Sequence, residues 1–269
     1  MRAAGPHRDR RLSALLLAWI GCAKPGSVVR YGPPGGGETG VTTRDTGALD
    51  SGAADTDVAD TSACPADMAP TGAVCMDRYE APNVAGVEPL VMYTYDEAES
   101  WCEARSRRLC TDAEWESACA GSNGSAYPYG DTREAGVCND DKTWLVYDQS
   151  RLDEWPASAS ATDVSSLDDL LTRASASSAA GADAADELSS LYQGDGGGES
   201  PGCSSDGVIF DLVGNVEEWT RRADGGEASF HGNLKGRYWA DTRTCQDNIT
   251  THGDAFRFYE IGFRCCQDP

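Results

Sequence analysis

The chain has few positive charges and no apolar run long enough to span a bilayer. Its 269 residues include 22 Lys and Arg against 44 Asp and Glu, a formal net charge of −22. Such an acidic chain repels phosphate backbones, so no nucleic-acid partner is expected. The apolar run from Leu12 to Ile20 has nine residues, whereas a membrane-spanning helix needs about 20. The sequence therefore argues against nucleic-acid-binding and membrane-spanning proteins.

The chain also lacks the closely spaced cysteine pairs that are typical of zinc and redox sites. It nevertheless contains 11 cysteines, and only three histidines. Cysteines at wide spacing favour disulfides, and disulfides persist in oxidising compartments. His7 lies in the N-terminal leader described next, so only His231 and His252 remain, which excludes an iron site built from three histidines within one chain.

The N-terminus is typical of an export signal. Arg8, Arg10 and Arg11 lie just before the short apolar run, which is followed by Gly21-Cys22. A small residue directly before a cysteine resembles a bacterial lipoprotein cleavage box. Residues 1–22 are thus predicted to form a signal peptide, with Cys22 lipidated and the protein attached to a membrane of the cell envelope through that lipid. A cut after Ala23 would instead give a periplasmic or secreted protein.

Two further segments contain few large apolar residues. Residues 23–62 are rich in Gly, Thr, Asp and Ala, which predicts a flexible tether. Between Asp153 and Ser200 there are ten acidic residues and one basic residue, Arg173, with a weak helical pattern around residues 164–171. We interpret residues 155–200 as a disordered acidic insertion in a surface loop. The folded domain is expected over residues 63–269.

Within that domain, two helices and then several short strands are predicted. Thr94 and Glu97 form one capping-box pattern, and Thr111 and Glu114 form a second, each followed by apolar residues at helical spacing. Short apolar runs resume at residue 207 and continue to residue 265. Helices followed by short strands favour an α+β fold.

Five motifs in this region resemble, in sequence and in order, those of the formylglycine-generating enzyme (sulfatase-modifying factor) family. The motifs are Tyr95-Asp-Glu-Ala-Glu-Ser-Trp-Cys102, Arg108-Leu-Cys-Thr-Asp-Ala-Glu-Trp-Glu116, Tyr127-Pro-Tyr-Gly-Asp131, Asp211-Leu-Val-Gly-Asn-Val-Glu-Glu-Trp219 and Ile261-Gly-Phe-Arg-Cys265. The resemblance implies a C-type-lectin-like α+β fold with little regular secondary structure, held by disulfides and calcium.

Enzymes of this family oxidise a substrate cysteine to formylglycine with copper held by two thiolates. The corresponding segment here, residues 234–245, contains a single cysteine, Cys245. Arg237 and Tyr238 replace small residues, and Asp241 lies near the place of one thiolate. Monovalent copper prefers soft sulfur ligands, so copper is not expected to bind.

The resemblance also implies two disulfides, Cys102–Cys265 and Cys119–Cys245. Cys64 and Cys75 are close enough in sequence to staple an N-terminal hairpin. Cys138–Cys203 would close the base of the insertion, which leaves Cys110–Cys266 by elimination. Cys265 and Cys266 could also exchange partners.

The loop from Asp211 to Trp219 contains the candidate metal ligands. Asp211 and Glu218 are hard carboxylates seven residues apart, and backbone carbonyls can complete a calcium shell. The resemblance assigns those carbonyls to Gly214 and Val216. The alternative is a solvated acidic turn with Trp219 packed inward. A weaker second calcium site would use Asn139, Asp140 and Asp153.

These features lead to three hypotheses of function. The first is an exported, non-catalytic binding or scaffold module, stabilised by calcium and disulfides, that recognises a protein or glycan ligand. The second is a formylglycine-generating oxidase acting on exported sulfatases, which the missing cysteine pair opposes. The third is a structural envelope protein without a specific ligand. Fold alone does not decide among them.

Overall fold

The computed structural model describes residues 64–269, so the predicted signal peptide, Cys22 and the tether lie outside the described residues. Helix α1 (Tyr95–Glu103) and helix α2 (Asp112–Ala120) begin where the sequence predicts. The Thr94 and Thr111 hydroxyls each accept a hydrogen bond from the backbone N–H three residues later, and the glutamate carboxylate at that position accepts one from the threonine backbone N–H. Both predicted capping boxes are therefore confirmed.

The strands form three small sheets. A four-stranded antiparallel sheet has the order β1-β2-β9-β3 and contains Met68–Thr71, Val74–Asp77, Cys265–Gln267 and Arg108–Leu109. A three-stranded sheet places β6 (Glu217–Arg221) between β7 (Gly232–Lys235) and β8 (Ile261–Phe263), antiparallel to β7 and parallel to β8. A short hairpin joins β4 (Ser204–Ser205) to β5 (Ile209–Phe210). Short strands in small sheets give the fold its modest regular structure.

Buried tryptophans join these elements. Trp101 of α1 and Trp219 of β6 are 1% exposed. Each donates its indole N–H to a distant backbone carbonyl, Trp101 to Val164 at 3.0 Å and Trp219 to Tyr93 at 3.1 Å. A buried indole needs such a partner, because an unsatisfied donor in the core is costly. These hydrogen bonds thus tie α1 to the loop at residue 164 and β6 to the loop just before α1.

Five disulfides cross-link the described domain. The pairs are Cys64–Cys75, Cys102–Cys265, Cys110–Cys266, Cys119–Cys245 and Cys138–Cys203. They are the five pairs named from the sequence and the resemblance. Cys265 and Cys266 bond to α1 and to the residue after β3, because adjacent residues of strand β9 point to opposite faces of the sheet. Multiple disulfides indicate an extracytoplasmic protein.

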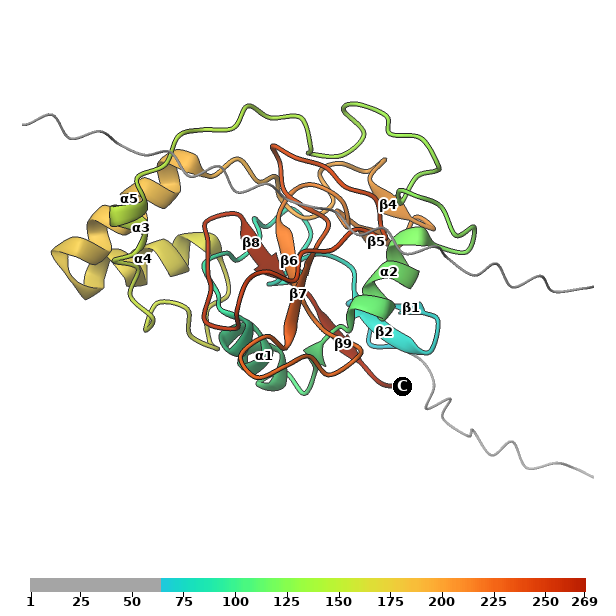
Figure 1. The fold of residues 1–269 in the computed structure, drawn as a ribbon, viewed down its shortest axis with the longest axis horizontal. Coiled ribbons are helices and arrows are strands. Elements are labelled where there is room, and N and C mark those ends of the chain that lie inside the picture. Colours follow the sequence, from blue (N-terminus) through green and yellow to red (C-terminus); the bar gives the residue numbers. More distant parts are fainter. Residues whose placement is uncertain (1–63) are drawn as a thin grey trace, which may run out of the picture. The chain divides into compact units, whose positions relative to one another are not determined.

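The predicted disorder of residues 155–200 is wrong. This region contains helix α4 (Leu167–Ser177) and helix α5 (Ala179–Leu191), and short helix α3 (Gln149–Leu152) precedes it. Figure 1 shows these three helices together at the left of the β7-β6-β8 sheet, whereas α2 lies at its right. Leu170 and Leu188 are fully buried within the main hydrophobic cluster.

The prediction of disorder was based on the overall composition of residues 155–200, which does not distinguish the buried face of a helix from its exposed face. Alanines and leucines recur at spacings of three and four residues and face the core, whereas most acidic residues face outward. Ser166 and Ser178 cap the two helices. Arg173 bonds Asp169 and Asp163, so the single basic residue of the region offsets part of its negative charge.

None of the helices in residues 64–269 has the length and apolarity needed to cross a membrane.

Candidate functional site

Two of the predicted calcium ligands lie in the core, Asp211 in the loop that joins β5 to β6 and Glu218 on β6. Asp211 is 3% exposed and Glu218 is fully buried. Gly214 has φ of +75°, and a Cβ at this position would overlap the Asn139 carbonyl oxygen, so only glycine fits. Asn215 follows with φ of +55° and donates its backbone N–H to the same carbonyl at 2.7 Å. The sequence Val-Gly-Asn-Val therefore makes the tight turn between the two carboxylates.

Glu218 is already paired in this arrangement. Arg264 donates to both of its carboxylate oxygens at 2.7 Å, and the Trp115 indole N–H donates to Oε2 at 2.9 Å. Both members of the Arg264–Glu218 pair are fully buried. A buried ion pair with this many hydrogen bonds organises the core, and removal of either partner leaves an uncompensated charge.

A third carboxylate, Glu80, shares this region, and sequence reasoning missed it. Asn215 donates to Glu80 Oε1 at 2.9 Å, whereas Oε2 is buried and has no hydrogen-bond partner. Burial, and then the charge of Asp211, raises the pKa of Glu80 well above its ordinary value. Burial likewise raises the pKa of Asp211 to about 6. Three carboxylates around one guanidinium leave this site short of positive charge.

The residues of the weaker second calcium site engage separate partners. The Asn139 side chain donates to Asn215 and to the Gln193 carbonyl, so it belongs to the first loop. Asp140 pairs with Arg133 at 2.9 Å, and Asp153 accepts from Gln149 on α3. Across residues 64–269, no three His, Cys, Asp or Glu side chains are grouped as metal ligands.

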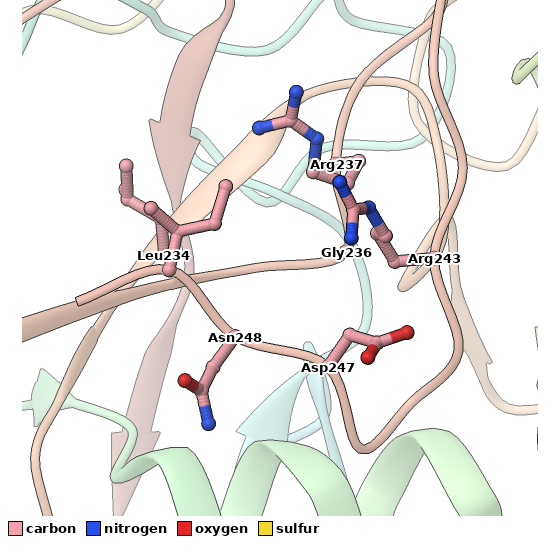
Figure 2. A pocket seen from close by; sticks show the side chains of 7 residues that line it. Leu234, Gly236, Arg237, Arg243, Asp247 and Asn248 are labelled. Carbon is pink, nitrogen blue, oxygen red and sulfur yellow. The ribbon is translucent and has the colours of Figure 1, made fainter. Parts of the chain in front are cut away.

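The segment after β7, where the family's thiolates are expected, contains ion pairs. Arg237 donates to Glu217 Oε1 and to Asp241 Oδ2, both at 2.9 Å. Figure 2 shows Arg237 and Arg243 on one side of a small cavity, with Asp247 across from them. That cavity measures about 10 Å³, room for about one water molecule. Cys245 at the end of the segment is bonded to Cys119 on α2.

A larger cleft of about 360 Å³ opens beside Arg237. It is lined by Tyr147, Gln149, Glu217, Arg237, His252, Phe256, Phe258, Glu260 and Ile261. Burial raises the pKa of Glu217, and burial together with the Glu217 charge raises the pKa of Glu260 to about 8. Burial and the Arg237 charge lower the pKa of His252, whose ring stacks on Phe256 at 3.9 Å between centroids. The cleft therefore combines aromatic walls with carboxylates.

Sequence reasoning also missed Glu260, although the sequence holds a signal for it. Glu260 lies inside the run Phe258-Tyr-Glu-Ile261, where an acidic residue interrupts apolar neighbours. A charged side chain within a run that enters the core is usually paired or functional. Glu80 has a weaker signal of the same kind, because it lies between Tyr79 and Ala81.

The elements, disulfides and buried acidic loop together define a formylglycine-generating-enzyme-like fold. The sulfatase-modifying factor enzyme 1-like domain family matches residues 50–269, so the chain belongs to this family. No curated protein matches the chain.

Solved structures include two similar proteins. The Treponema denticola variable protein 1 is 20% identical, with 61% of this chain and 48% of that chain covered and a TM-score of 0.31. PvdO from Pseudomonas aeruginosa is 14% identical, with 73% and 80% covered and a TM-score of 0.42. The chain thus spans about half the length of the Treponema protein.

Proposed function

We propose that the protein is an exported, non-catalytic binding module of the sulfatase-modifying-factor type. The observation that carries this proposal is the disulfide between Cys245 and Cys119. Cys245 is the single cysteine of residues 234–245, the segment in which the family's oxidases have two copper-binding thiolates, and this disulfide engages it. A disulfide sulfur is no thiolate, and a carboxylate such as Asp241 is a poor ligand for monovalent copper.

The state of the other cysteines supports the same proposal. Each of the ten cysteines in residues 64–269 takes part in one of the five disulfides. Arg237, paired with Glu217 and Asp241, stands where the family has a small residue. A guanidinium has only N–H donors and no lone pair to offer a metal, so Arg237 cannot serve as a copper ligand.

Calcium at the Asp211 loop is the structural part of the proposal. The Glu80 oxygen without a partner and the excess of carboxylates over guanidinium groups suit a divalent cation. Asp211 and the carbonyls of Gly214 and Val216 would hold the ion. Glu218 would join them only by giving up one of its present donors. Calcium would supply positive charge to this part of the core and would favour ionised carboxylates.

The decisive experiment offers the purified oxidised protein, with copper and oxygen, a peptide that contains a sulfatase-type cysteine. Mass measurement detects conversion, because formylglycine differs in mass from cysteine and carries a carbonyl. We expect the peptide to remain unchanged while a copper-active family member converts it in parallel. Conversion that Cys245→Ser abolishes would support the oxidase hypothesis and refute ours. Conversion that survives this substitution would refute ours as well and would locate the chemistry elsewhere.

A further inference from the structure

The cleft beside Arg237 is lined by Glu260, whose carboxylate has one buried oxygen without a partner. Glu260 is 8% exposed and lines this cleft of about 360 Å³. Its Oε2 is buried and accepts no hydrogen bond from the described residues. Such an oxygen is costly in a folded protein unless a ligand or a proton satisfies it.

Arg237, the cation beside this carboxylate, already forms ion pairs with other residues. Arg237 is shared by Glu217 and Asp241, so two carboxylates divide one positive charge. Arg243 lies 3.8 Å from Asp241 and is half exposed. His252 adds no charge at neutral pH, because burial and Arg237 lower its pKa. Once Glu260 is ionised, the cleft therefore has an excess of negative charge.

The walls of the cleft are aromatic. The rings of Tyr147 and Phe258 meet edge to face, with centroids 5.0 Å apart, and Phe258 lies 4.7 Å from Tyr259. Phe256 stacks near Phe258 at 5.9 Å. Aromatic rings cover an apolar stem, and their faces attract a cation. The volume falls within the range of ordinary small-ligand pockets.

We infer that this cleft binds a primary ammonium group on an aliphatic stem, such as a lysine side chain, with Glu260 as its ion-pair partner. The inference rests on the proposed binding function and names the chemistry of its ligand. An anion would meet Glu217 and Glu260 with no free cation to receive it. A guanidinium prefers two parallel carboxylate oxygens, whereas a single free buried oxygen suits the compact ammonium.

Titration of Glu260 makes the inference measurable. The groups that act on its carboxylate are Glu217, Arg237, Tyr259 and Asp241, and burial together with Glu217 raises its pKa to about 8. An aliphatic amine stays protonated up to about pH 10. The ammonium should bind ionised Glu260, so its affinity should rise between pH 6 and pH 8, by up to roughly fiftyfold if only the ionised form binds.

The test uses the oxidised protein and Nα-acetyl-lysine methylamide, titrated by NMR in amine-free buffer. The neutral control ligand is the same compound acetylated on its side-chain nitrogen. The variant is Glu260→Gln, which keeps the shape and removes the charge. The matched control variant is Glu103→Gln, an exposed position at the end of α1. A thermal melt of each variant checks that it is folded.

We expect the lysine compound to shift the amide signals around Glu260 and the acetylated compound to leave them unchanged. Glu260→Gln should raise Kd at least tenfold and abolish the pH dependence, whereas Glu103→Gln should change neither. Failure of the lysine compound to bind, equal binding of both compounds, or an unchanged pH profile in folded Glu260→Gln would overturn the inference. If the copper assay still shows no peptide oxidation, such a result refutes the ammonium site alone.

Discussion

Replacing Glu260 with glutamine should make the protein less sensitive to rising pH. In the folded state the pKa of Glu260 is about 8, raised by burial and by Glu217, whereas an unfolded glutamate titrates near its ordinary value of about 4.3. The folded protein therefore keeps a proton that the unfolded chain releases between these values. Stability from this group is complete below the unfolded pKa and is lost as the pH rises towards 8.

The magnitude follows from the two pKa values. Between pH 5 and pH 8 the free energy of unfolding should fall by roughly 3 to 4 kcal/mol through Glu260 alone. For a domain of this size that corresponds to roughly 6 to 16 °C in melting temperature. Glu80 and Asp211, whose pKa values are also raised, add to the fall in the unmodified protein and in the variant alike. The difference between the two proteins isolates Glu260.

The assay is unfolding of the oxidised protein by urea, a neutral denaturant, at pH 5, 6, 7 and 8 in acetate and phosphate buffers. Amines are left out because they would occupy the proposed ammonium site. The unmodified protein and Glu260→Gln should be nearly equal in stability at pH 5, and the variant should be more stable at pH 8. Parallel stability curves across this range would refute the placement of Glu260 as a buried carboxylate without a counter-charge.

Three more predictions concern other parts of the structure. A hundredfold excess of Ca²⁺ over its Kd should stabilise the protein by about 2.7 kcal/mol. Asp211→Ala should remove most of that gain, whereas Asp141→Ala, at an exposed position, should not. Melting curves that are identical with Ca²⁺ and with chelator would contradict the calcium site. Alkylation of the unreduced protein followed by intact mass should label no cysteine in residues 64–269, and any labelled cysteine there would contradict the five-disulfide arrangement. Leu188→Ala should cost about 2 to 5 kcal/mol by denaturant unfolding, because Leu188 is fully buried on α5; an effect below 0.5 kcal/mol would mean that α5 does not pack against the core.

Local patterns in the sequence were enough to predict helices α1 and α2 and the fold class. The capping boxes at Thr94 and Thr111 are complete within four residues each, so they determine where α1 and α2 begin. The five motifs in order identified the family before any contact was known.

The tertiary structure decided which charges are compensated. Glu218 meets Arg264, 46 residues further along the chain, and Asn215 donates to Glu80 across 135 residues. The separations in sequence carry no sign of these contacts, since they depend on how the sheets and loops pack. The acidic composition of residues 155–200 suggested disorder, but packing of α4 and α5 against the core overrode it. Glu260 is the clearest case: its position in an apolar run shows that it enters the interior, and only the fold shows that its Oε2 has no partner there.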